Sequence, residues 1–149
     1  MTLRSHHPWH LAIGEQSPLP SAPAHDTVRV GLALGMPAID ALVTDGTAVG
    51  PLRYCLAHHQ LLVPVEPGTT HRWQAAHSDC VPGTRTWRCV SDGYRGCLGL
   101  WVTRPSAARV STTSADALHE ALSRTRARLT TPRGAHHVHR RGEVCRAHA

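Results

Sequence analysis

Apolar residues in the first two-thirds of the chain follow the two-residue period of β-strands. Residues 27–34 (TVRVGLAL) place Val or Leu at every second position, which is typical of a strand with one buried face. Residues 52–56 alternate in the same way, and residues 61–65 (LLVPV) form the continuous apolar run expected of a central strand. His58 and His59 separate these two runs, so the pattern predicts a hairpin with a tight turn between its strands.

Weaker patterns on either side of the hairpin extend the predicted sheet. Residues 9–13 (WHLAI) alternate over a short stretch and predict an edge strand. Residues 86–90 and 98–102 predict two further strands, separated by a Ser-Asp-Gly turn and a glycine-rich stretch. Between the hairpin and these strands, residues 69–77 favour a short helix.

Two segments show the spacing of helices. A short helix is expected to begin at Pro37, because proline suits the first turn, and to end at Asp45-Gly46. Its apolar face consists of Ile39, Leu42 and Val43. A longer helix is expected after the capping residues 111–114, with an apolar stripe of Leu118, Leu122, Thr125 and Leu129. Acidic residues early in this helix and arginines late in it match the helix dipole.

These elements predict a small single domain of the α/β (α+β) class, in which a mixed sheet of about five strands carries a short helix and a C-terminal packing helix. A length of 149 residues suits one such domain. We expect a flexible N-terminal segment (1–25), an α/β core (26–105), a C-terminal helix with its lead-in (106–131) and a disordered basic tail rich in His and Arg (132–149).

Positive charge is concentrated in the C-terminal third. Residues 1–102 carry seven arginines and seven acidic residues, whereas residues 103–149 carry nine arginines and three acidic residues. A neutral body with a basic C-terminal third favours a polyanionic partner, so DNA or RNA is the expected ligand. The candidate nucleic-acid-binding residues are Arg124, Arg126, Arg128, Arg140 and Arg141. The alternative is that these arginines only keep the C-terminal third solvated.

No part of the sequence has the pattern of a membrane or secretory segment. No stretch approaches the ~20 consecutive apolar residues of a membrane helix, and the first residues lack the apolar centre of a signal peptide. We therefore expect a cytoplasmic protein that has no membrane partner and whose thiols are reduced or metal-bound. The identity of any protein partner does not follow from the sequence.

Two short Cys/His pairs suggest a metal site. Cys55 with His58, and His77 with Cys80, have the spacing at which one turn can present both members of a pair to Zn²⁺. These four residues are the predicted zinc ligands. Two further cysteines are in reserve as ligands: Cys89 and Cys97. The alternative is that the cysteines are buried free thiols and that the histidines, thirteen in all, lie at the surface.

Catalytic motifs are sparse. Cys55 with His58 or His59 is a conceivable nucleophile and base, but no glycine elbow or oxyanion motif accompanies the pair. Paired carboxylates at the spacing of a two-metal site and a glycine-rich phosphate loop are both absent from the sequence. The sequence therefore leans against an enzyme. Three tryptophans near arginines favour a core role over stacking on bases: Trp73, Trp87 and Trp101.

About half of the chain follows a recognisable order of segments. Residues 28–34 (VRVGLAL) and 37–43 (PAIDALV) are followed by GPLRYCLAHHQLLVPVEPG and later by a strand that ends in VTRPS. This order resembles the C-terminal part of the short bifunctional DNA primase/polymerase-type proteins of GC-rich bacteria. Those proteins have a strand, a helix ending near Gly, a Gly-Pro that opens a hairpin, and a later strand ending in a Pro-Pro-Ser-like turn. Residues 50–51, 61–68 and 104–106 occupy the matching places here.

The resemblance implies a polymerase-like fold whose active members hold metal ions with paired acids on the first of these strands. At that place this chain reads Val28-Arg29-Val30, with no acidic residue. The family's hairpin histidine corresponds to His58 or His59, which would lack carboxylate partners. The resemblance therefore implies a truncated, non-catalytic relative, and the basic C-terminal third adds the expectation that it binds nucleic acid. Two alternatives stay open: a zinc-stabilised module that binds a protein partner and, less favoured, a cysteine-dependent enzyme.

Overall fold

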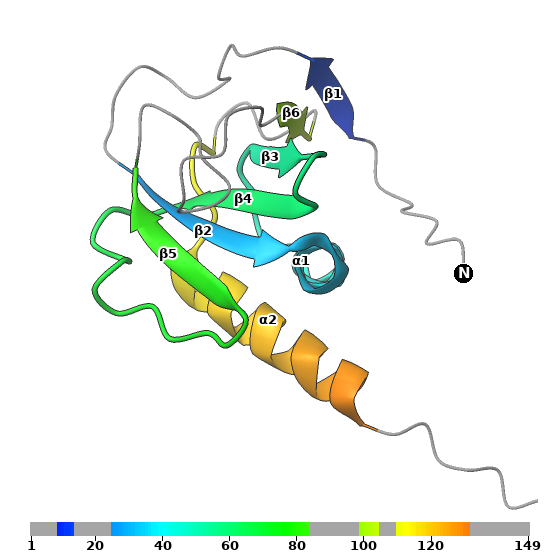
Figure 1. Ribbon diagram of the computed structural model, residues 1–149, viewed down its shortest axis with the longest axis vertical. Coiled ribbons are helices and arrows are strands. Elements are labelled where there is room, and N and C mark those ends of the chain that lie inside the picture. The colour runs from blue at the N-terminus through cyan, green and yellow to red at the C-terminus, as the bar shows by residue number, and fades with distance from the viewer. Residues whose placement is uncertain (1–8, 14–24, 84–98, 105–109, 132–149) are drawn as a thin grey trace, which may run out of the picture.

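The computed structural model describes residues 9–13, 25–83, 99–104 and 110–131 of the chain. Within these residues, six strands form one sheet and both helices pack on the same face of it (Figure 1). In chain order the elements are β1 (His10–Ile13), β2 (Asp26–Gly31), α1 (Leu32–Thr44), β3 (Leu52–Cys55), β4 (Gln60–Val65), β5 (Ser78–Pro82), β6 (Gly99–Thr103) and α2 (Ala115–Thr130). The predicted small α+β domain is confirmed.

The strand order across the sheet is β1-β6-β3-β4-β2-β5, and each neighbouring pair of described strands is antiparallel. A parallel bridge joins the sheet to the segment before α2, between Val65 and Thr113. The described sheet therefore has one strand more than the five or so expected, and parallel pairing is confined to this bridge among the described residues.

The two faces of the sheet differ because side chains alternate along each strand. Val28 on β2 lies opposite Val63 on β4, and Val30 lies opposite Leu61, so all four side chains point to the face that carries the helices, the helix face. Arg29, between the two valines, points to the other side, the reverse face. The core on the helix face also contains buried residues of both helices: Ala38, Ile39, Leu42, Val43, Ala115, Leu118, Ala121 and Leu122.

β2 ends earlier than the sequence pattern predicts, and α1 is correspondingly longer. The strand stops at Gly31, and the backbone N–H of Leu32 donates a hydrogen bond to His59 O at 2.9 Å. α1 begins at Leu32, so Pro37 lies inside the helix instead of in its first turn. The sequence could not place this boundary, because the apolar and glycine residues at 32–36 suit a buried strand and a buried helix equally.

A glycine lets α1 begin directly against the sheet. A Cβ atom at Gly35 would lie 2.8 Å from Val30 Cγ1 and 3.0 Å from Leu61 Cδ2, closer than such atoms pack. The small residue is therefore required by the approach of the helix to β2 and β4 and not by a turn.

Other predicted strands have mixed outcomes. The predicted hairpin is present as β3 and β4, with a turn over residues 56–59 in which His59 has a φ of 50°. The predicted edge strand is present as β1, which pairs with β6 and places Leu11 opposite Val102. The strand predicted at residues 86–90 lies outside the described residues.

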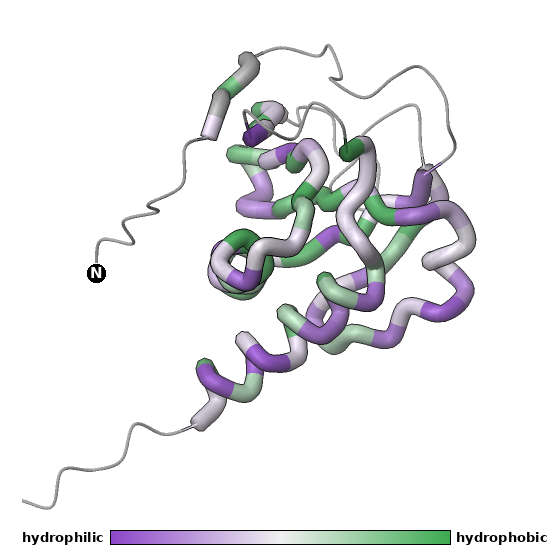
Figure 2. Tube along the Cα trace, turned by 180° about the vertical axis from the view of Figure 1, so that it is seen from behind, coloured by the Kyte–Doolittle hydropathy of each residue, from purple (hydrophilic) through white to green (hydrophobic). Residues whose placement is uncertain are grey.

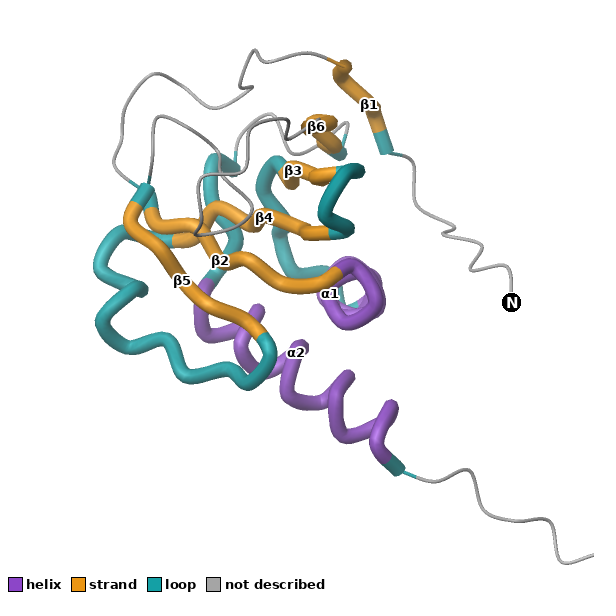
Figure 3. Tube along the Cα trace, viewed as in Figure 1, coloured by secondary structure: helices purple, strands orange, loops and turns teal. Residues whose placement is uncertain are grey.

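Residues 69–77, for which the sequence favours a short helix, instead form turns that lead into an unpredicted strand (Figure 3). Thr69 Oγ1 donates a hydrogen bond to Glu66 O at 2.6 Å, and Trp73 Nε1 donates one to Ser78 Oγ at 3.0 Å. β5 then pairs with β2 at the edge of the sheet. Its side chains are only partly buried, so β5 lacks the apolar alternation by which the other strands were predicted.

α2 is present as predicted, but its apolar stripe is buried only in part. Ser114 caps the helix, and hydrophobic and hydrophilic residues succeed each other along it (Figure 2). Leu118, Leu122 and Thr125 are buried, whereas Leu129 is 64% exposed. The cause is visible in Figure 1: α2 packs beside α1 and its C-terminal end extends past the body of the domain. A burial prediction for Leu129 from helical spacing is therefore wrong.

Thr113 joins the segment before α2 to the sheet. Its side chain is 0% exposed, its backbone N–H donates to Pro64 O at 2.8 Å, and its Oγ1 accepts a hydrogen bond from Gly50 N at 3.0 Å. Thr113→Val keeps the shape of the side chain but leaves the buried Gly50 N–H without this acceptor. We expect the free energy of unfolding to fall by about 1 to 3 kcal/mol, measured by urea denaturation. Thr112→Val, at a partly exposed position, is the control, and an equal loss there would contradict this role of Thr113.

Candidate functional site

The first predicted Cys/His pair is assembled at the turn between β3 and β4. Cys55 Sγ and His58 Nδ1 lie 3.2 Å apart. Cys55 is opposite Gln60 in the sheet and therefore points to the reverse face. Its thiol belongs to a residue that is only 2% exposed, which does not suit the nucleophile of a cysteine-dependent enzyme, because reactive cysteines are partly accessible.

The second predicted pair lies elsewhere in the sheet. Cys80 on β5 is opposite Val28 and points to the helix face, and His77 immediately precedes this strand. Two strands, β4 and β2, separate β3 from β5. With about 4.8 Å between neighbouring strands, Cys80 and Cys55 are on the order of 14 Å apart or more.

The four predicted zinc ligands therefore do not converge in the structure. Cys55 and His58 meet on one face, whereas His77 and Cys80 belong to a strand that is not adjacent. Within the described ranges, no three Cys, His, Asp or Glu side chains are grouped so that they could hold a metal ion. The two reserve ligands lie outside the described residues: Cys89 and Cys97.

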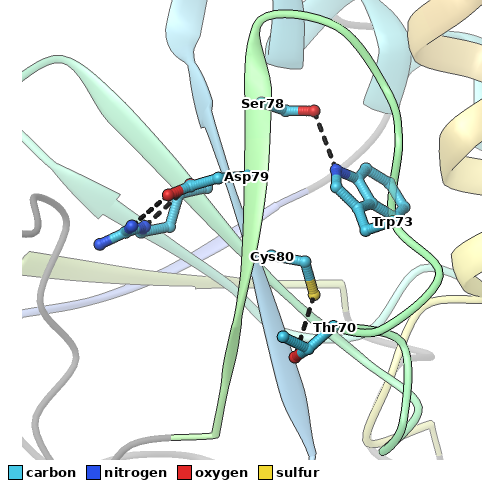
Figure 4. Close-up of polar contacts among 6 residues, drawn as sticks. Thr70, Trp73, Ser78, Asp79 and Cys80 are labelled. Atoms are coloured by element: carbon cyan, nitrogen blue, oxygen red, sulfur yellow. Dashed lines mark hydrogen bonds and ion pairs between the residues drawn. The ribbon is translucent and has the colours of Figure 1, made fainter.

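Cys80 takes part in the contacts that hold the loop before β5 to the sheet (Figure 4). Its Sγ lies 3.8 Å from Thr70 Oγ1, close to the hydrogen bond between Trp73 and Ser78. Burial raises the pKa of Cys80 to about 11, although the contact with Thr70 opposes the rise. Cys80 is therefore a protonated thiol at neutral pH, and its contacts are those of a structural residue.

Two arginines on the reverse face are buried, which a count of charges along the chain does not reveal. Arg29 is 8% exposed, and its Nε donates to Asp79 Oδ1 at 2.9 Å while its Nη2 contacts Oδ2. Arg53 is 9% exposed and lies over the ring of Trp101, 5.6 Å from the centroid. Gly99 leaves room for it, because a Cβ there would lie 2.3 Å from Arg53 Nε. Trp101 is itself 0% exposed, so its predicted core role is confirmed.

The five arginines predicted to bind nucleic acid fall into two groups. Arg140 and Arg141 lie outside the described residues, and the other three lie on α2. Arg124 is engaged in ion pairs, since its Nη2 is 3.1 Å from Asp45 Oδ2 and its Nε is 3.8 Å from Glu120 Oε1. A phosphate group would have to compete with these two carboxylates for Arg124.

Arg126 and Arg128 belong to the last turns of α2, residues 126–130, which are all exposed and are called the projecting end below. Neither arginine has an acidic partner among the residues that the structure describes. With 3.6 residues per turn, Arg128 lies about 40° around the helix axis from Arg124, and Arg126 lies about 200° from it. The projecting end therefore presents guanidinium groups to solvent on two sides.

Two carboxylates near the helix face hold backbone groups. Asp26, at the start of β2, is 7% exposed, and its Oδ2 accepts a hydrogen bond from Thr70 N at 2.8 Å. Glu66 Oε2 accepts one from Ala115 N at 2.8 Å, at the N-terminus of α2, where the helix dipole favours negative charge. Both carboxylates therefore have a structural role in holding backbone N–H groups.

The sequence did not reveal an apolar pocket beside α1, which is lined in part by Met36 and by alternate residues of β3 and β6. The spacing of these residues is that of a core face, and nothing in the local pattern shows that they lie beyond the reach of the two described helices.

Neither of the two described helices is long and apolar enough to cross a membrane. Comparison with known proteins finds no relative: no protein-family model, no curated protein and no solved structure matches the chain.

Proposed function

We propose that the chain is a non-catalytic, primase/polymerase-like domain that binds DNA or RNA through the arginines of its C-terminal third. The order β2, α1, β3, β4 and then, after the additional strand β5, β6 supports this, because strand, helix, hairpin and later strand is the order by which residues 26–105 resemble that family. At the place of the family's metal-binding acids, Val28 and Val30 belong to the core, and Arg29 is paired with Asp79. Nucleotidyl transfer needs carboxylates for its metal ions, so these residues favour binding without catalysis.

The projecting end of α2 is the observation that carries the binding proposal. Arg126 and Arg128 are exposed there, have no acidic partner among the described residues, and lie beyond the body of the domain, where a nucleic acid can approach without meeting the sheet. Guanidinium groups bind phosphates bidentately, and phosphate contacts carry no base sequence. Binding is therefore expected to show little sequence preference.

A salt titration of binding to duplex DNA tests the proposal. If about five phosphates are neutralised by the full chain, the log–log slope of affinity against salt is roughly −4 to −5. Arg128→Gln is expected to reduce the magnitude of this slope by about 1, and R126Q/R128Q by about 2. Arg72→Gln is the matched control. It removes one positive charge from the surface, as Arg128→Gln does, but Arg72 is paired with Asp116 at 2.6 Å and lies outside the projecting end.

Four outcomes would contradict the proposal. A flat salt dependence would mean that phosphate contacts do not drive binding. An absence of binding at low salt would mean that duplex DNA is not a ligand of the chain. Equal effects of R72Q and R128Q would assign binding to net charge and not to the projecting end. Metal-dependent incorporation of nucleotides by the purified chain would contradict its non-catalytic part.

A further inference from the structure

An apolar pocket of about 330 Å³ lies on the helix face of the sheet, beside α1. α1 and α2 pack on each other, and among the strands α1 contacts chiefly β2 and β4, so neither of the two described helices extends over the helix face toward β3, β6 and β1. Leu52 and Val102, 1% and 7% exposed, form the floor of the pocket, and Leu11 and Leu56, 69% and 48% exposed, lie at its rim. The volume is at the lower end of the range for small-molecule sites.

Tyr54 supplies a hydrogen-bond donor in this apolar lining. It extends from β3 toward Met36 on α1, and its hydroxyl donates a hydrogen bond to Met36 Sδ. A thioether sulfur is a weak acceptor. An oxygen acceptor on a bound molecule would therefore be a better partner for this hydroxyl than the sulfur is.

The charge near Tyr54 restricts what the pocket can hold. Burial raises the pKa of Tyr54 to about 12, and the negative charge of Asp40 adds to the rise. The hydroxyl is thus a donor throughout the physiological range. Asp40 follows Met36 by one turn of α1, and its charge opposes a second negative group placed against Tyr54.

We propose that this pocket binds a neutral, largely aliphatic small molecule with one oxygen acceptor, such as a medium-chain ketone or ester. The size follows from the volume: a cavity of about 150 Å³ holds benzene, so a pocket of about 330 Å³ holds roughly twelve non-hydrogen atoms. The aliphatic chain contacts Leu52, Leu100 and Val102, and the acceptor oxygen replaces Met36 Sδ as the partner of the Tyr54 hydroxyl. None of these residues is an arginine of α2, so the site is independent of nucleic-acid binding.

Isothermal titration calorimetry of the full chain with 2-octanone and with octanoate tests the proposal. The two probes have chains of equal length and differ in charge. We expect 2-octanone to bind at one saturable site and octanoate to bind roughly 10-fold more weakly, because the carboxylate is desolvated and lies near Asp40. Tyr54→Phe is expected to weaken 2-octanone binding about 5-fold through loss of the hydrogen bond.

Variants at the rim distinguish binding in this pocket from non-specific hydrophobic binding elsewhere on the surface. Leu56→Asp is expected to weaken 2-octanone binding more than about 10-fold, because it places a charge at the mouth of an apolar site. Leu129→Asp is the matched control, since Leu129 is an exposed leucine on the projecting end, outside the pocket, and it is expected to leave the affinity unchanged.

The proposal is overturned if 2-octanone shows no saturable binding up to its solubility limit. It is also overturned if octanoate binds as tightly as 2-octanone, or if L129D weakens binding as much as L56D. Sedimentation equilibrium supplies the remaining outcome: a dimer that is lost in Leu11→Asp would assign the pocket to a second copy of the chain. None of these results bears on the salt dependence of DNA binding, so the two proposals can be contradicted independently of each other.

Discussion

Replacing Leu118 by alanine is expected to lower the free energy of unfolding by about 2 to 5 kcal/mol, the usual cost of a buried Leu→Ala change. Leu118 is 0% exposed and belongs to the core between α1, α2 and the helix face of the sheet. The substitution removes apolar surface from this core and leaves a cavity, because the helix and the strands beneath it can collapse only in part. A domain of this size has about 5 to 15 kcal/mol of stability in all, so the loss is a large fraction of the total.

The same substitution about three turns later on α2 is the control. Leu129 lies on the same helix and in the same predicted stripe, but it is 64% exposed, so Leu129→Ala is expected to change stability by no more than about 0.5 kcal/mol. Urea denaturation, followed by far-ultraviolet circular dichroism, gives the midpoint for each variant. Equal losses in L118A and L129A would show that the end of α2 is covered in solution, contrary to the arrangement in Figure 1.

The Cys80 thiol is expected to be alkylated by iodoacetamide at pH 8 roughly 100-fold more slowly than an ordinary cysteine, because the thiolate is the reacting species. Its pKa is raised from the ordinary 9.0 to about 11, chiefly by burial on the helix face of β5. Mass spectrometry of the peptide that contains Cys80 measures the rate in the folded chain. The same peptide, alkylated in urea-unfolded chain, supplies the reference rate.

The raised pKa has a matching effect on stability. Because folding raises the pKa of Cys80, the unfolded chain loses this proton first as the pH increases, and the unfolded state is then favoured. The contribution of the protonated Cys80 thiol to the free energy of unfolding is therefore intact below about pH 9 and declines as the pH rises toward 11. Alkylation of Cys80 at the same rate in the folded and the unfolded chain would show that the thiol is not shielded.

Local sequence signals were sufficient for the elements that depend on neighbouring residues. The hairpin over residues 52–65 was predicted because both of its strands and its turn lie within one short segment. α2 was predicted because the capping residues 111–114 and the helical spacing after them mark its start and its inner face, and the structure shows that Ser114 is the residue that caps it. β5 was not predicted, since an edge strand with partly exposed side chains has no apolar alternation to show.

The candidate metal site shows where such signals end. Cys55 and His58 are brought together by the turn that lies between them, and a spacing of three residues is enough to predict that contact. Whether they meet His77 and Cys80 depends on which strands are neighbours. That order, with β4 and β2 between the two pairs, follows from the packing of the whole sheet and leaves no mark in either pair's own spacing.

The sequence by itself therefore determined the class of the domain, the hairpin, the inner face of α2 and the basic character of the C-terminal third. Only the tertiary structure decided that Arg124 meets Asp45, that Leu129 is exposed, and that an apolar pocket remains beside α1. The physical reason is the same in each case. Periodicity reports which side of an element is apolar, but the extent of the surface opposite that side is set by elements distant in the chain. The end of α2 therefore extends past the body of the domain, and neither described helix extends over the strands β3, β6 and β1.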